Sequence, residues 1–190
     1  MIFERVYNVM KEFMSRYSYE SVHLFLNQAA IGLFGMTLAL AAGMADNDVL
    51  RTVTSVFSVI FFLFLQYIVM WKIGAQDRLS YDLGKLKKNY SVPVFMWLLA
   101  NSLNLLLALL ISLSMWVDVP VLSSIGGFAS VIKLIIEGMY TGLLAIRVGG
   151  VPLNSMWFMY FLTTLPALAV IFAAYVLGFN NVRLSGNKKK

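Results

Sequence analysis

The sequence predicts an all-α, polytopic transmembrane helical bundle with four or five crossings and an N-terminal amphipathic interfacial helix. Of its 190 residues, 60% are hydrophobic and only 13% are charged, whereas a soluble globular domain has about 45–50% apolar and about 25% charged residues. The mean hydropathy is +0.79. The charged residues also fall between long uncharged stretches, each close to the length of about 20 residues that a helix needs to cross a bilayer. We therefore expect a single membrane domain over 1–190.

Composition excludes several classes of protein. A chain this apolar is neither a cytosolic enzyme nor a free nucleic-acid-binding domain, although its net charge is +6. With no cysteine and one histidine, it has no disulfide framework, thiolate metal site or histidine-rich metal cage. The glycine, serine and histidine motifs of common enzyme and nucleotide-binding families do not occur. We expect no enzyme activity, no catalytic residue, no metal, no cofactor and no nucleic-acid partner.

Residues 1–20 place Val6, Met10, Phe13 and Tyr17 at helical spacing, with charged residues on the other face. This pattern predicts an amphipathic helix that lies in the headgroup layer before the first span. The alternative is a helix packed on a cytoplasmic protein.

Five apolar segments follow. They lie at about 23–44, 52–71, 92–115, 121–147 and 155–178. Asp46 and Asp48 sit in the tight turn before the second span and are expected to cap it. Pro93 fits the first turn of the third span, and Pro166 predicts a kink in the fifth.

The long connection 72–91 carries five basic and two acidic residues. This balance predicts a cytoplasmic loop attracted to anionic lipids. A second interpretation is a docking site for a cytoplasmic protein partner, such as an ATPase or coupling subunit. Gly74 and Gly84 bracket what we expect to be a short surface helix within it.

The distribution of Lys and Arg predicts that the N-terminus is cytoplasmic. Five full crossings would place nine basic residues inside and five outside. If segment 121–147 instead enters and returns on the outer side, the numbers become 12 and 2, with Lys133 within the membrane. The Gly and Ser content of this segment permits a re-entrant turn where protein or a water cavity surrounds it. A single plain helix is equally compatible with its length, so both interpretations stay open.

Lys133 and Glu137 are the main candidates for function. An ionised side chain at mid-bilayer is costly, and such groups usually pair or line a pathway. Four residues apart, these two share a helix face and are able to form an ion pair. The candidate intramembrane polar site comprises Lys133, Glu137, Ser130, Gln66, Asn101 and Asn104. The simpler explanation for the amide-bearing residues is packing between helices. A helix-packing stripe is expected at Gln28, Gly32, Gly35 and Ala39.

The runs WKIGAQDR, KLKKNYSVPVF and LLANSLNLLLALL resemble small multipass membrane proteins of Gram-positive bacteria for which no mechanism is assigned. The resemblance covers about the middle third of the chain and implies a bacterial cell membrane. The length also invites comparison with six-helix substrate-binding subunits of vitamin transporters, but only five apolar segments are clear, and an AxxxA pattern appears late, at Ala41 and Ala45.

The expected function is that of a small-solute or ion transport component with a polar intramembrane site. The alternative is a non-catalytic membrane partner or assembly subunit of a larger complex, in which the small-residue faces bind other helices.

Overall fold

A computed structural model describes residues 2–117 and 119–182, apart from several side chains among the first twelve residues. The chain is almost entirely helical, which confirms the all-α prediction. Within these described residues, three helical segments are long and apolar enough to cross a membrane: Phe13–Met44, Asp48–Asp82 and Met159–Phe179. The number rises to five if two strongly bent helix pairs each count as one span. The chain is thus built as an integral membrane protein.

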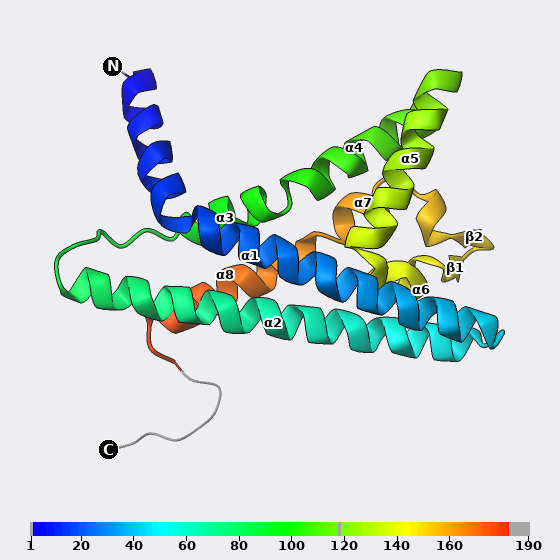
Figure 1. Ribbon diagram of the computed structural model, residues 1–190, viewed down its shortest axis with the longest axis horizontal. Helices are drawn as coiled ribbons and strands as arrows, with labels where there is room; N and C mark the ends of the chain where they lie inside the picture. The colour runs from blue at the N-terminus through cyan, green and yellow to red at the C-terminus, as the bar shows by residue number, and fades with distance from the viewer. Residues whose placement is uncertain (1, 118, 183–190) are drawn as a thin grey trace.

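Helices α1 (Ile2–Met44) and α2 (Asp48–Asp82) form a long antiparallel pair (Figure 1). The expected interfacial helix 1–20 is not separate from the first span, because no Gly or Pro interrupts the chain before Gly32. Instead, the ribbon of α1 turns away near its N-terminal end (Figure 1). The N-cap of α2 is Asn47, whose Oδ1 accepts from the Leu50 amide at 2.9 Å. The sequence predicts Asp46 and Asp48 as caps, and neither occupies that position.

The boundaries predicted for the basic loop 72–91 are wrong. Helix α2 continues to Asp82, and only residues 83–91 connect it to the next helix. Gly74 does not begin a surface helix: it lies within α2, where a Cβ would collide with the Tyr175 carbonyl oxygen of α8 (Leu165–Phe179). The helix ends before Gly84, which has the positive φ of 69° that favours glycine.

The third and fifth spans are interrupted helices. In the third, α3 (Val92–Ala100) and α4 (Ser102–Trp116) meet at Asn101 with a bend of 57°. Pro93 lies in the first turn of α3, as predicted. In the fifth, α7 (Met159–Leu162) and α8 are separated at Thr163 and Thr164. Pro166 lies in the first turn of α8, directly after this break. Because a proline disrupts the helical turn before it, the interruption agrees with the kink predicted there, and Met159–Phe179 still counts as one span.

The fourth segment, 121–147, is not one plain helix. Helix α5 (Pro120–Ile136) ends at Glu137, and the short η1 (Gly138–Tyr140) and α6 (Thr141–Leu144) continue at 89° to it. At the start of α2, Ser55 accepts a hydrogen bond from the amide of Gly142 in α6 at 2.8 Å. The start of α5, α6 and the α1–α2 turn all lie toward one end of the longest axis (Figure 1). The bent pair is either a broken span or a re-entrant segment.

A small hairpin and a short helical turn follow at that end. Strands β1 (Arg147–Val148) and β2 (Val151–Pro152) pair antiparallel, and Gly149 and Gly150 make the turn with φ of 62° and 85°. A 3₁₀ turn, η2 (Leu153–Ser155), leads to α7.

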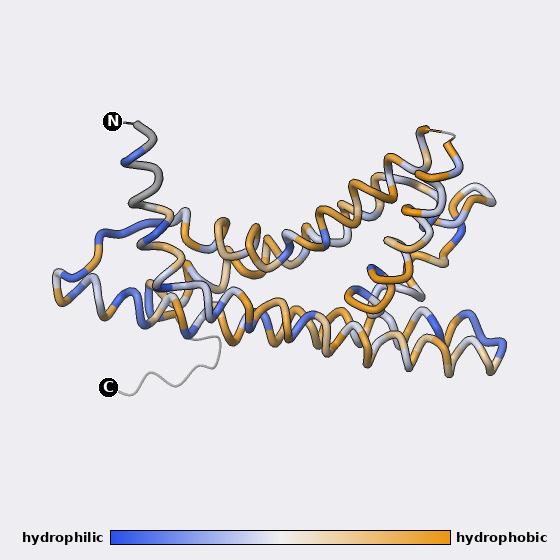
Figure 2. Tube along the Cα trace, turned by 45° about the horizontal axis from the view of Figure 1, so that its top comes forward, coloured by the Kyte–Doolittle hydropathy of each residue, from blue (hydrophilic) through white to orange (hydrophobic). Residues whose placement is uncertain are grey.

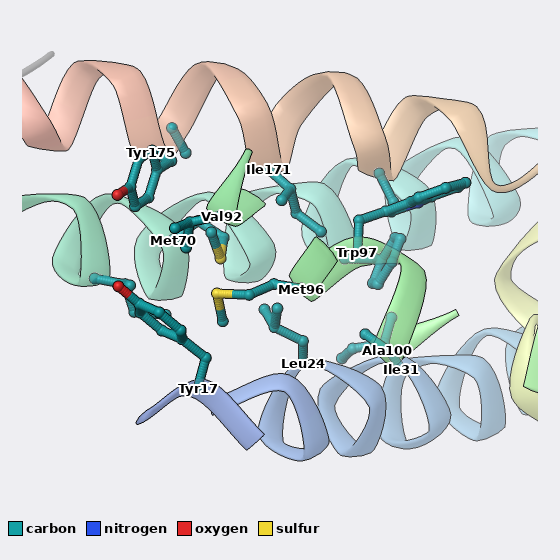
Figure 3. Packing of buried hydrophobic residues seen from close by; sticks show 14 of the residues in the cluster. Tyr17, Leu24, Ile31, Met70, Val92, Met96, Trp97, Ala100, Ile171 and Tyr175 are labelled. Carbon is teal, nitrogen blue, oxygen red and sulfur yellow. The ribbon is translucent and has the colours of Figure 1, made fainter. Parts of the chain in front are cut away.

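The main core lies between α1, α2, α3 and α8. Its fully buried side chains include Leu24, Met70, Met96 and Ile171, which meet in Figure 3. A second cluster joins α4 to α5 through Leu107, Ile111, Ala129 and Ile136. Much of each long helix is made of hydrophobic residues (Figure 2). Many of their large side chains are exposed, as expected where lipid rather than water surrounds a bundle.

Candidate functional site

The ion pair that the sequence predicts lies at the break of α5. Lys133 Nζ is 2.9 Å from Glu137 Oε2, and the two side chains are only 4% and 3% exposed. Glu137 is the residue after the last turn of α5, and its amide donates to the Lys133 carbonyl at 2.8 Å. Backbone and side chain of Glu137 therefore both hold the pair where the chain changes direction.

Two further side chains bind the Glu137 carboxylate. Gln28 Nε2 of α1 donates to Oε1 at 3.3 Å, and Thr163 Oγ1 donates to Oε2 at 2.8 Å. Gln28 belongs to the predicted helix-packing stripe. Thr163 was not singled out, although its signal is visible: two adjacent threonines precede Pro166 inside an apolar span and mark an interruption. The carboxylate thus joins α1, the end of α5 and the α7–α8 break.

The small-residue stripe of α1 brings these groups together. A Cβ at Gly32 would collide with the carbonyl oxygens of Ile135 and Ile136, and one at Gly35 with the backbone of Met139. Ala39, the remaining expected packing residue, is 4% exposed. Close backbone approach through glycine is a common device of membrane helices. In this protein, the close approach lets α1 pack directly against the break at Glu137.

Asn101 and Asn104 approach the same region from the third span. Asn104 Nδ2 donates to Asn101 Oδ1 at 3.2 Å, and Asn101 Nδ2 donates to the Trp97 carbonyl at 3.1 Å. The Trp97 indole then donates to the Thr164 carbonyl at 3.1 Å. Thr164 is the sequence neighbour of Thr163, which binds Glu137. Thr163 and Thr164 of the fifth span thus contact both the fourth span, at Glu137, and the third, at Trp97.

Gln66 and Ser130 lie outside this chain of contacts. Gln66 Nε2 donates to the Leu24 carbonyl of α1 at 3.0 Å, which is the helix-packing role weighed for amide side chains. Ser130 is half-buried, and its hydroxyl donates to the Gly126 carbonyl of its own helix at 2.8 Å. Of the six candidate residues, the structure thus pairs Lys133 with Glu137 and Asn104 with Asn101, and it gives Gln66 and Ser130 other partners.

Unsatisfied polar atoms surround the break. Among the residues that the structure describes, Lys133 Nζ makes its ion pair without the geometry of a hydrogen bond, and the buried hydroxyls of Tyr140 and Thr141 have no hydrogen-bond partner. A buried donor without an acceptor is costly. These groups therefore have unused capacity to bind a polar molecule or ion.

A second buried charge was missed. Asp77 is 3% exposed and accepts from the Tyr17 and Tyr175 hydroxyls at 2.8 and 2.9 Å, and from Arg16 at 3.0 Å. The sequence pattern places Asp77 in the loop 72–91, because charged residues follow the apolar stretch of the second span. The helical spacing from Gln66 and Met70 to Asp77 could have shown that this residue continues the buried face of α2.

Comparisons with protein-family models, with curated proteins and with solved structures give no match. The class of the protein therefore follows from its own architecture: an integral membrane protein of apolar helices with an ion pair buried at a helix break.

Proposed function

We propose that this chain is a small-solute or ion transport component of a bacterial cell membrane, with its polar path at Lys133 and Glu137. The observation that carries this proposal is the buried ion pair at the break of α5, in contact with the α7–α8 break through Thr163. Irregular backbone at membrane depth is tolerated where protein or a water-filled cavity surrounds it. Secondary transporters build their substrate sites from such discontinuous helices.

The arrangement of charge supports a re-entrant fourth segment. The N-terminal part of α1, the 83–91 connection and the end of α8 lie at one end of the molecule, and the α1–α2 turn lies at the other (Figure 1). Eight basic residues of the described chain belong to the N-terminal part of α1, the C-terminal part of α2 and the 83–91 connection, whereas the α1–α2 turn is followed by one, Arg51. The positive-inside rule makes that end cytoplasmic. In this orientation the chain crosses four times, and α5 and α6 enter and return from the outer side.

Cysteine accessibility tests the polar path, since the chain has no native cysteine. Thr163→Cys reports on the site, and Leu134→Cys, 41% exposed on the outer surface of α5, is the control beside it. We expect a small, charged, membrane-impermeant thiol reagent to label Thr163→Cys and to leave the lipid-facing control unlabelled. If a folded Thr163→Cys protein resists the reagent from both sides of the membrane, no aqueous path reaches this site and the proposal fails.

The same assay tests the topology. Cysteines at Ser124 and Asn154 should react in intact cells, because the re-entrant arrangement places both outside. A cysteine at Asn89 should react only after permeabilisation. Labelling of Ser124 and Asn154 from opposite sides would contradict the re-entrant arrangement.

One observation favours the alternative of a membrane partner or assembly subunit. Ser123 and Gly127 are exposed on α5, and a Cβ at Gly127 would meet no atom within 4 Å. Small residues four apart on an open face suit the approach of another helix. A cytoplasmic subunit binding at the basic connection 83–91 would belong to the same function. Efficient disulfide capture of Gly127→Cys in a defined complex, combined with an inaccessible Thr163→Cys, would favour this function over transport.

A further inference from the structure

A large cavity opens at the basic end of the bundle, away from Lys133 and Glu137. Its volume is about 850 Å³, and it lies between the N-terminal part of α1, the 85–89 segment, α3 and the end of α8. Its walls are mostly apolar and include Phe13, Phe95 and Leu98. A smaller cavity of about 240 Å³ continues along α1 and α4 and shares Leu99 and Ser102 with it. We call the two together the α1–α3 groove.

Basic side chains line the larger cavity on one side. Lys85 and Lys87 belong to its lining and are exposed. Within residues 2–117 and 119–182, neither has an ion-pair partner. Arg16 also lines the cavity and pairs with Asp77. Because that carboxylate is already bound by one guanidinium and two tyrosine hydroxyls, the charge left at the mouth is positive.

This combination points to an amphipathic anion. An apolar groove alone accepts any hydrocarbon chain, and lysines alone attract any phosphate. A molecule that satisfies both must carry an anionic head beside an apolar tail. The groove opens at the end where the basic residues gather, which is the level at which anionic headgroups of the cytoplasmic leaflet lie.

We propose that the α1–α3 groove binds one anionic phospholipid, with its phosphate at Lys85 and Lys87 and an acyl chain along Phe95, Leu99 and Ser102. The bound lipid packs the N-terminal part of α1 against α3. This proposal depends on the membrane location of the chain and not on transport. A failure of the polar path at Lys133 and Glu137 would therefore not contradict it.

Lipid retention by the purified full chain tests the proposal. The protein in detergent is mixed with dioleoyl phosphatidylglycerol, with dioleoyl phosphatidylcholine or with glycerol 3-phosphate. Bound lipid is counted by native mass spectrometry, and the melting temperature is measured in parallel. We expect one phosphatidylglycerol to be retained and to raise the melting temperature. Equal retention of phosphatidylcholine would overturn the role of the anionic head. An equal shift from glycerol 3-phosphate would identify a free phosphate site and overturn the lipid.

Two variants locate the site. Lys85→Ala with Lys87→Ala should weaken phosphatidylglycerol binding about thirtyfold, equivalent to about 1 kcal/mol per basic residue. The charge-matched control, Lys11→Ala with Lys72→Ala, removes two exposed lysines that do not line the groove and should change binding little. Ser102→Trp fills the groove and should abolish retention with every lysine present.

If Lys85→Ala with Lys87→Ala weakens phosphatidylglycerol binding no more than the control variant does, the proposed site is wrong. A folded Ser102→Trp protein that retains the lipid would show adsorption to surface charge and would also overturn it.

Discussion

Replacing Glu137 with Gln should destabilise the protein strongly. The substitution keeps the shape of the side chain and removes its charge, so Lys133 becomes a buried cation without a counter-ion, at 4% exposure. Only one oxygen then remains to accept from both Gln28 and Thr163, whose bonds the two carboxylate oxygens now share. Breaking a buried pair by removing one partner typically costs about 3–5 kcal/mol. We expect a loss of that size in the free energy of unfolding.

The double variant separates charge from packing. Lys133→Met with Glu137→Gln removes both charges and keeps similar volume, and replacing a whole buried pair is often close to neutral. The double variant should therefore recover most of the stability that the single variant loses, and the coupling between the two sites gives the energy of their interaction. If the polar path is correct, the recovered protein should still lack transport.

Unfolding in mixed micelles with increasing sodium dodecyl sulfate measures both variants, with helix content followed by circular dichroism. Folded yield in the membrane gives a second readout. A Glu137→Gln protein as stable as the parent would refute the pairing energy worked out above. A double variant no more stable than the single one would show that hydrogen bonds to Glu137, rather than its charge, stabilise this region.

Two further predictions use the same unfolding measurement. Gly32→Ala should lower the free energy of unfolding by about 1–3 kcal/mol, because its Cβ would collide with backbone oxygens of α5. The control Gly43→Ala lies in open space on the same helix and should be neutral or slightly stabilising. Equal effects of the two substitutions would contradict the close packing of α1. Tyr175→Phe should lower the free energy of unfolding by about 1.5–3 kcal/mol, because it removes one hydrogen-bond donor from buried Asp77. The control Tyr19→Phe, at a position that is 78% exposed, should change stability by less than about 0.5 kcal/mol. A Tyr175→Phe protein as stable as the parent would argue against the hydrogen bonds to Asp77.

The sequence predicts the Lys133–Glu137 contact because helical spacing alone places these side chains together. It also predicts the stripe of Gln28, Gly32 and Gly35, since small residues at steps of three and four are informative in any membrane helix. The spacing of residues does not show which helix packs against each helix face. That α1 packs on the break of α5, rather than on a regular helix, follows only from the three-dimensional arrangement.

Helix ends were the weakest part of the prediction for a related reason. Charge marks where an apolar span meets water, but it does not end a helix. Arg78 and Asp82 form an ion pair four residues apart and extend α2 beyond the apolar stretch. Asp77 was therefore placed in a loop, although it lies in the core among hydroxyl donors from α1 and α8.

The sequence does not show that the interrupted spans contact one another. The indole of Trp97, one turn before the break at Asn101, donates to the Thr164 carbonyl at the break before α8, and Asn101 in turn donates to the Trp97 carbonyl. The Thr164 carbonyl also accepts from the Leu168 amide of α8 at 3.4 Å, so the indole, from a residue 67 positions away, is its second donor. No local pattern contains both halves of such a contact. Pro166 signals the interruption of the fifth span in the sequence itself, whereas the contact that joins this interruption to the third span is visible in neither segment alone.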